Sequence, residues 1–351
     1  MNHNSLKKAL TVGASALIFL LASSLSHAET HRESLLKKIP SSSSLKYLYG
    51  DIEFSNPQDT TNSDCKALDL EFIKKFPNYE KKCLSIGYEI TDYKSSAVLI
   101  KGTRKNESTP QNLLIYNHGH GGVPAETENF AYTFIAGALE SGNDVLLVSM
   151  PFLGVEKQYQ PIMVKSWDGE VNYNPEDLEN TPAAIHGVFE LFDTGKSHYM
   201  RFFMDSAVVN AFSLAKGYNK INFVGLSGGA TTGLYACDVL KDLLSNCVLA
   251  AGVMPLKFRF IKRNFGDAEQ VSSSFFKKNK TIDLVKEISD SKTELALIYN
   301  NQDACCYTEE SANWFKKDIE NHNIKNVNFI IRNSTNHDFD PYFILNTINS
   351  N

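Results

Sequence analysis

The stretch from Lys220 to Ala230, with the sequence KINFVGLSGGA, restricts the possible folds of this chain more than any other feature. An apolar segment containing Ile221, Phe223 and Val224 is typical of a buried strand, and it stops at Ser227. Apolar residues then recur at helical spacing, at Ala230, Gly233, Leu234, Cys237, Leu240, Leu243 and Leu244. The sequence therefore predicts a buried strand, a very tight turn at Ser227 and an amphipathic helix.

The turn itself has the pattern Gly-x-Ser-x-Gly, from Gly225 to Gly229. A serine in so tight a turn has a strained backbone, and neighbours with side chains would clash with the strand and the helix. The turn lifts the hydroxyl clear of the sheet and points the first free N–H groups of the helix at whatever the serine attacks. The alternative is a glycine- and serine-rich turn without chemistry. The position between a buried strand and an amphipathic helix favours a nucleophile.

Short apolar strands and helical patterns alternate through most of the remaining chain. An antiparallel hairpin is expected first, formed by Leu84–Tyr93 and Ser96–Lys101. Strand–helix–strand units then predict a mostly parallel sheet with helices on both faces. The further strands are expected at Asn112–Tyr116, Asp144–Ser149, Cys247–Val253, Glu294–Tyr299 and Val327–Ile331.

The amino terminus has the order of charges and apolar residues of a secretory signal peptide. Lys7 and Lys8 precede an apolar run from about Ala9 to Leu21, and Ser26-His27-Ala28 supplies small residues before Glu29. The run is short for a membrane span. The cleavage point has no cysteine, so a lipid anchor is not expected. We therefore expect export to the periplasm or the medium, cleavage near Ala28 and no stable membrane anchor.

Net charge argues against a nucleic-acid partner. The chain has 35 Lys and Arg against 40 Asp and Glu residues, and removal of the signal changes the formal charge from −5 to −7. The basic residues between 257 and 292 are interpreted as a solvated face, with a site for an acidic ligand as the alternative. They include Lys257, Arg259, Lys262, Arg263, Lys277, Lys278 and Lys280.

The six cysteines are an even number in a protein expected to be exported, which indicates disulfides. Local pairing favours Cys65 with Cys83 and Cys237 with Cys247. Cys305 and Cys306 are adjacent and form either a vicinal bridge or bonds to different partners. No Cys-x-x-Cys pair and no His-x-x-x-His beside an acid is present, so the sequence predicts neither a metal nor a cofactor.

The predicted organisation is a signal peptide at 1–28, an N-terminal arm at 29–82 and one α/β domain at 83–351. Residues from about 156 to 182 interrupt the alternation of strands and helices, and they carry Tyr159, Trp167 and Tyr173. The aromatics favour packing over a disordered loop, so this insertion is a candidate lid or substrate wall.

From about Leu84 onward, the order of elements resembles the α/β-hydrolase superfamily. His118-Gly119 follows an early strand, the Gly225–Gly229 turn lies in mid-chain, and Asp303 and His337 follow the last two strands. The superfamily arranges its catalytic residues in the order Ser, Asp or Glu, His. The resemblance therefore implies an α/β-hydrolase fold.

The resemblance implies a nucleophile at Ser227, a base at His337 and an orienting acid at Asp303, with Asp338 and Asp340 as local rivals to Asp303. It implies an oxyanion hole from the backbone N–H groups of Gly228 and His120. Gly121 is the near alternative to His120, because this chain has HGHGG where many lipases have HGGG. His118 and the His120 side chain are expected to brace their loop. His186, His198 and His322 are interpreted as structural or exposed.

These residues indicate an exported serine hydrolase that cleaves a carboxylic ester of a small molecule or a glycan. A serine peptidase and a secreted acyltransferase use the same residues, and a non-catalytic binding protein of this fold is the remaining alternative. The oxidation of Cys305, Cys306 or both is expected to fix the acid loop, and with it Asp303, against His337. Oligomeric state does not follow from the sequence.

Overall fold

The computed structural model describes residues 58–60, 66–88, 91–103, 111–121, 129–156, 162–166, 169–173, 186–187, 201–261, 268–271 and 280–349. The signal peptide, Cys65 and His198 lie outside these residues, as does most of the insertion at 156–182. Among the described helices, none combines the length and apolar character needed to cross a bilayer.

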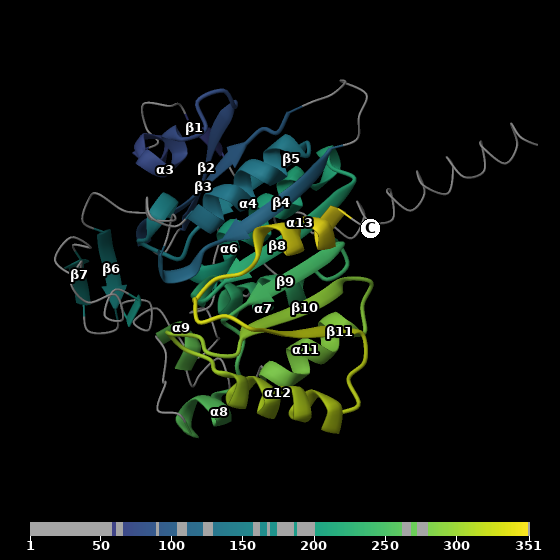
Figure 1. Ribbon diagram of the computed structural model, residues 1–351. Helices are drawn as coiled ribbons and strands as arrows, with labels where there is room; N and C mark the ends of the chain where they lie inside the picture. The colour runs from purple at the N-terminus through teal and green to yellow at the C-terminus, as the bar shows by residue number, and fades with distance from the viewer. Residues whose placement is uncertain are drawn as a thin grey trace, which may run out of the picture. The chain divides into compact units, whose positions relative to one another are not determined.

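The described strands form one sheet of eleven strands (Figure 1). Their bounds are β1 Gln58–Thr60, β2 Lys81–Tyr88, β3 Thr91–Ile100, β4 Asn112–Asn117, β5 Asn143–Val148, β6 Ile162–Ser166, β7 Gly169–Tyr173, β8 Lys220–Leu226, β9 Asn246–Ala250, β10 Glu294–Asn300 and β11 Val327–Arg332.

The main path of the sheet runs β1-β2-β3-β5-β4-β8-β9-β10-β11. The strands from β5 to β11 along this path pair in parallel, whereas β1, β2 and β3 pair antiparallel with their neighbours. The hairpin of β6 and β7 joins the sheet at the first residue of β3, through the Thr91–Val164 pair. A mostly parallel sheet after an antiparallel hairpin confirms the predicted fold class.

Helices connect the parallel strands and cover both faces of the sheet. The α-helices are α3 Glu71–Lys74, α4 Asn129–Glu140, α6 Arg201–Leu214, α7 Gly228–Leu240, α8 Leu256–Ile261, α9 Ala268–Val271, α11 Thr281–Ser289, α12 Glu309–Asn321 and α13 Pro341–Asn349. Four short 3₁₀ turns are described: η1 Lys66–Asp69, η2 Gly119–Gly121, η3 Gly154–Glu156 and η6 Ala215–Gly217.

Two separate apolar cores result from the alternation of side chains along each strand. In β4, Ile115 faces a core shared with α6, α7, α11 and α12, represented by Val208, Leu234 and Phe315. Its neighbour Leu114 faces a second core that contains Phe134 and other residues of α4, α13 and α3. In Figure 1, α4 and the yellow α13 lie in front of the central strands. Both faces of the parallel sheet are therefore buried, as continuous apolar strands require.

The structure corrects the expected bounds of the hairpin. Tyr88 pairs with Thr91, so the turn lies between them, and Lys94–Ser95 lies inside β3 opposite Ile86–Gly87. The expected bounds left Lys94 and Ser95 as the turn, but Ser95 is buried while Lys94 is exposed, which is the alternation of a strand.

The boundary expected between the N-terminal arm and the domain falls inside β2. Phe72, Ile73 and Phe76 of the arm are buried in the second core, so residues from Ala67 onward pack as part of the domain. Farther along the chain, Cys237 of α7 and Cys247 of β9 form the disulfide expected from local pairing. Cys83 is also disulfide-bonded.

Candidate active site

Ser227 is the single residue between the end of β8 at Leu226 and the start of α7 at Gly228. Its backbone has φ 57° and ψ −127°, a left-handed conformation that costs on the order of 1–3 kcal/mol for a residue with a side chain. Hydrogen bonds hold the strained residue: its N–H donates to the carbonyl of Ala250 at 2.9 Å, and its carbonyl accepts from Ala230 and Thr231. The sharp turn predicted from the glycine pattern is present.

Glycines make room for this turn. A Cβ added at Gly225 would lie 2.5 Å from the Gly229 carbonyl oxygen, and one added at Gly229 would lie 2.3 Å from that of Asn117. A third position, Gly252 after β9, approaches more closely still, because a Cβ there would lie 1.8 Å from the carbonyl oxygen of Ser227. The pattern around Ser227 indicated the first two glycines, but no sequence signal pointed to Gly252.

Replacing Gly252 with alanine is therefore expected to push the backbone of Ser227 out of place. Forcing a methyl group into a packed backbone typically costs about 1–3 kcal/mol, so we expect the free energy of unfolding to fall by about 3 kcal/mol. Chemical denaturation of Gly252→Ala measures this. Gly217→Ala is the matched control, because no atom lies within 4 Å of its added Cβ. Equal stability of the two variants would contradict the close approach.

Asp303 and His337 meet at the carboxyl edge of the sheet. Asp303 follows the end of β10 at Asn300, and His337 follows the end of β11 at Arg332. The His337 Nδ1 atom lies 2.8 Å from Oδ2 and 3.0 Å from Oδ1 of Asp303, whose side chain is completely buried. A carboxylate in this position fixes the imidazole with its proton on Nδ1 and leaves Nε2 to accept a proton.

The two rival carboxylates have other partners. Asp338 forms an ion pair with Arg332 at 3.2 Å, and Asp340 accepts the backbone N–H groups of Tyr342 and Phe343 at the start of α13. Among the described residues, Asp303 is therefore the carboxylate bonded to His337.

Ser227 lies at the same edge, two strands away from β10 along the sheet. The Nε2 atom of His337 is buried, and no hydrogen bond joins it to Ser227 or to any other described residue. Hydrogen bonds between a nucleophile and its base often form at full strength only when substrate is bound. The structure thus brings Asp303 and His337 into contact, whereas the hydrogen bond between His337 and Ser227 is not formed in it.

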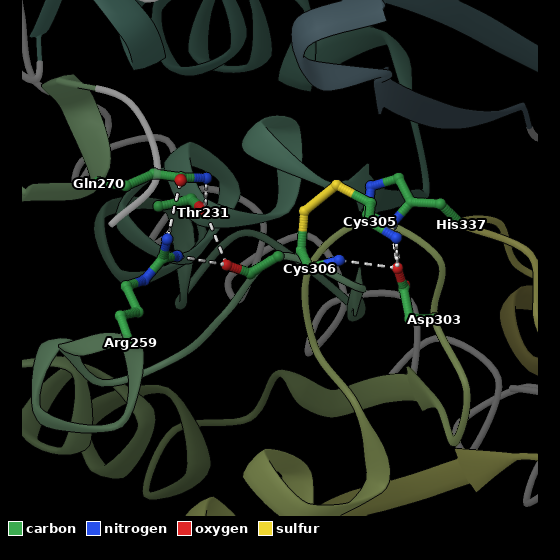
Figure 2. Close-up of a disulfide and its surroundings, with 8 residues drawn as sticks. Thr231, Arg259, Gln270, Asp303, Cys305, Cys306 and His337 are labelled. Carbon is green, nitrogen blue, oxygen red and sulfur yellow. Dashed lines mark hydrogen bonds and ion pairs between the residues drawn. A yellow bond between two sulfur atoms is a disulfide. The ribbon is translucent and has the colours of Figure 1, made fainter. Parts of the chain in front are cut away.

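A disulfide between Cys305 and Cys306 lies beside Asp303 and His337 (Figure 2). The backbone N–H groups of both cysteines donate to Oδ1 of Asp303, at 2.8 and 3.0 Å. A ring nitrogen of His337 lies within 4.8 Å of both sulfurs. Of the two arrangements left open by the sequence, the structure has the vicinal bridge, and the bridged residues hold the acid directly.

Loss of this bridge is expected to loosen the two N–H donors and reduce the preorganisation of Asp303. We expect Cys305→Ser/Cys306→Ser to lower kcat about tenfold, which corresponds to about 1.4 kcal/mol of transition-state stabilisation. Steady-state kinetics measures this. Cys237→Ala/Cys247→Ala is the control, because it removes a disulfide of the core and is expected to lower stability by about 2–3 kcal/mol with little change in kcat. An unchanged kcat in the first variant would contradict the proposed function of the bridge.

The loop after β4 crosses directly over the turn at Ser227. Gly119 has φ +81°, and a Cβ there would lie 2.9 Å from the backbone nitrogen of Gly228. The Gly228 N–H donates no hydrogen bond within the described part of the chain, as expected for the first residue of a helix. His118 is buried and its Nδ1 lies 2.7 Å from the Tyr116 hydroxyl, so its ring braces the loop. This placement fits an oxyanion hole that contains Gly228, with His120 or Gly121 as the second donor.

The His120 side chain extends to a group that the sequence did not indicate. Its Nε2 lies 3.0 Å from Oε1 of Glu269, and His186 Nδ1 lies 3.3 Å from Oε2 of the same carboxylate. Burial alone would raise the pKa of the Glu269 carboxyl, but the two imidazoles outweigh it and hold the pKa well below its usual range. The three residues are far apart in the sequence, so no local spacing pattern predicted their meeting.

Arg259 is the clearest exception to the predicted solvated basic face, because it is only 2% exposed. Its guanidinium donates to the carbonyls of Gly252 and Met254 and to Oε1 of Gln270. Gln270 in turn donates to Thr231 in the first turn of α7. Figure 2 shows this group on the far side of the Cys305–Cys306 bridge from His337. The buried charge anchors α9 and the segment after β9 to the helix that follows Ser227.

The strand order, the strained serine between β8 and α7, and the acid and histidine after the last two strands together define an α/β-hydrolase fold. No family model and no curated protein matches the chain.

Among solved structures, the chain is similar to Est1E from Butyrivibrio proteoclasticus, at 12% identity and a TM-score of 0.45, over 73% of this chain and 92% of that one. It is similar to TT1662 from Thermus thermophilus, at 13% identity and 0.45, over 72% and 91%. It is also similar to the acylaminoacyl peptidase of Pyrococcus horikoshii, at 15% identity and 0.47, over 78% of this chain and 41% of that one.

Proposed function

We propose that the protein is an exported serine hydrolase that cleaves carboxylic esters through an acyl-enzyme. The observation that carries the proposal is the contact of His337 with the buried Asp303 at the edge of the sheet where the strained Ser227 turn also lies. A serine hydroxyl is not ionised near neutral pH and needs such a base. Among acyl-transfer reactions, ester hydrolysis requires no catalytic group beyond the nucleophile, the base, the acid and the oxyanion donors.

In the proposed reaction, Ser227 Oγ attacks the ester carbonyl carbon while His337 Nε2 removes the hydroxyl proton. The resulting oxyanion accepts hydrogen bonds from the N–H of Gly228 and from that of His120 or Gly121. The imidazolium, stabilised by Asp303, then donates its proton to the departing alcohol oxygen. A water molecule, deprotonated by the same imidazole, attacks the acyl-enzyme, and the imidazolium returns the proton to Ser227 Oγ as the acid leaves.

The proposed substrate is an ester of a small molecule or a glycan. The charged, apolar and small residues of segment 1–28 support export, and the disulfides Cys237–Cys247 and Cys305–Cys306 fit an oxidising compartment. Cleavage near Ala28 leaves a mature protein without that segment.

A panel of substrates tests the reaction class. We expect the mature protein to hydrolyse p-nitrophenyl esters, with a rate that depends on acyl-chain length, and to leave aminoacyl and dipeptidyl p-nitroanilides intact. A preference for short acyl groups would favour a deacetylase over a lipase, and transfer of the acyl group to an added alcohol would favour an acyltransferase. Hydrolysis of anilides without ester hydrolysis would replace the proposed esterase with a peptidase. Failure of every ester and anilide would favour a binding protein.

A further inference from the structure

We propose that His120, His186 and Glu269 form a binding site for a divalent metal ion of the zinc class, beside the turn that carries Ser227. The three side chains come from distant segments: His120 from η2, His186 from the segment before α6, and Glu269 from α9. One ligand atom from each lies within 4.8 Å of the other two. Two imidazoles and one carboxylate are a ligand set that zinc commonly takes in proteins.

The distances fit two ligands on one ion. Zinc lies about 2.0–2.2 Å from histidine nitrogen and carboxylate oxygen, so tetrahedral neighbours are separated by about 3.3 Å. The Glu269 oxygens lie 3.0 Å from His120 Nε2 and 3.3 Å from His186 Nδ1. The same distances would suit hydrogen bonds. However, neither oxygen of the fully buried Glu269 accepts a hydrogen bond of ordinary geometry from any described residue. A buried carboxylate in this state requires a nearby cation.

The contact made by Nε2 of His186 fixes the tautomer of this ring. Its Nε2 lies 3.0 Å from the carbonyl oxygen of Pro151, which can only accept, so Nε2 carries the proton. In the neutral ring, the lone pair is then on Nδ1, the nitrogen that lies 3.3 Å from the Glu269 carboxylate. The lone pairs of Nδ1 and of the carboxylate then face each other, and either a metal ion or a second proton on the ring must lie between them. A histidine that binds a metal usually donates its other N–H to a backbone carbonyl in this way.

The residue next to Glu269 anchors this turn of α9 to its surroundings. Gln270, the next residue of α9, accepts from Arg259 at 2.7 Å and donates to Thr231 at 3.2 Å. Arg259 also donates to two backbone carbonyls and not to Glu269, whose carboxylate therefore faces the two imidazoles.

A metal here would act on the active site by position. The His120 ring lies so close to Gly228 that a Cβ there would be 2.6 Å from its Cε1 and Nδ1. An ion on Nε2 would fix this ring over the start of α7 and fix the loop that carries the proposed second oxyanion donor. His120, in this respect, is a positioning residue. The metal site itself stands whether or not the protein cleaves esters.

The test measures metal binding directly, with activity left aside. We expect the chelator-treated mature protein to bind one equivalent of Zn²⁺ by calorimetry and to give the visible absorption of tetrahedral Co²⁺. Glu269→Gln and His186→Ala are expected to weaken Zn²⁺ binding about 100-fold or more. His322→Ala is the matched control, because His322 lies exposed beside Asp318 at the end of α12 and is expected to leave binding unchanged.

A second measurement does not depend on the folding of any variant. In wild-type protein with ¹⁵N-labelled histidine, Zn²⁺ is expected to shift the Nδ1 signal of one ring and the Nε2 signal of another. Absence of one-to-one binding would overturn the proposal, and so would binding that Glu269→Gln and His186→Ala leave intact in folded protein. In the first case, a proton shared between Glu269 and the imidazoles takes the place of the ion.

Discussion

Replacing Ser227 with alanine is expected to lower kcat/KM for an activated ester by about 10⁴-fold or more, because the nucleophile of the proposed acyl-enzyme is lost. The backbone of the residue is already held by hydrogen bonds to Ala250, Ala230 and Thr231, and none of these uses the hydroxyl. The folded structure and the melting temperature are therefore expected to stay unchanged. Initial rates on p-nitrophenyl acetate and a thermal unfolding curve measure both quantities.

Ser213→Ala is a suitable control for this variant. The Ser213 hydroxyl donates to the carbonyl of Val209 within α6, so its loss removes a serine hydroxyl away from the site. We expect this control to retain the wild-type rate within about twofold, because the hydroxyl lies away from the site. The free energy of unfolding is also expected to change by only about 0.5 kcal/mol or less, as for other surface hydroxyls. Equal rates for Ser227→Ala and the wild type would remove Ser227 from the reaction.

Replacing Asp303 with asparagine is expected to lower kcat about 10³- to 10⁴-fold with little change in KM. The asparagine oxygen can keep the two N–H groups of Cys305 and Cys306 that now donate to Oδ1. The amide NH₂ then faces His337 Nδ1 in place of Oδ2, and it can only donate. The imidazole proton moves to Nε2, which can no longer accept a proton from Ser227.

Asp338→Asn separates this effect from a general loss of charge near His337. Asp338 pairs with Arg332, so its replacement is expected to change kcat by no more than about threefold, in keeping with the small worth of partly exposed ion pairs. Steady-state kinetics of the two variants at neutral pH provides the comparison. If Asp338→Asn were the more damaging change, the acid assigned to His337 would be wrong.

The fold and the central residues of the site were predictable from the sequence because their signals are local or follow chain order. The apolar strand before Ser227 and the helical spacing after it are contained in one stretch of sequence. The carboxyl ends of parallel strands meet at one edge, so residues just after the last two strands were expected together, and Asp303 and His337 are in contact. Adjacent cysteines left two arrangements open, and only the structure has decided between them.

The parts that sequence reasoning missed depend on contacts between distant segments. Arg259 belongs to a run of basic residues, and its burial depends on acceptors from Gly252, Met254 and Gln270 that the run does not indicate. Glu269 meets His120 and His186 across three segments, which no spacing rule of neighbouring residues describes. The hairpin turn was misplaced because composition alone does not reveal that the polar Ser95 is buried.

The most direct test of the central claim is to react the mature protein with a fluorophosphonate and to locate the adduct by intact mass and peptide mapping. The phosphonyl group resembles the tetrahedral intermediate and forms a lasting bond to an activated serine. We expect one adduct per chain on Ser227, and none in folded His337→Ala protein over the same time. An adduct on a different residue, or none on a protein that hydrolyses esters, would contradict the assignment of Ser227 as the nucleophile.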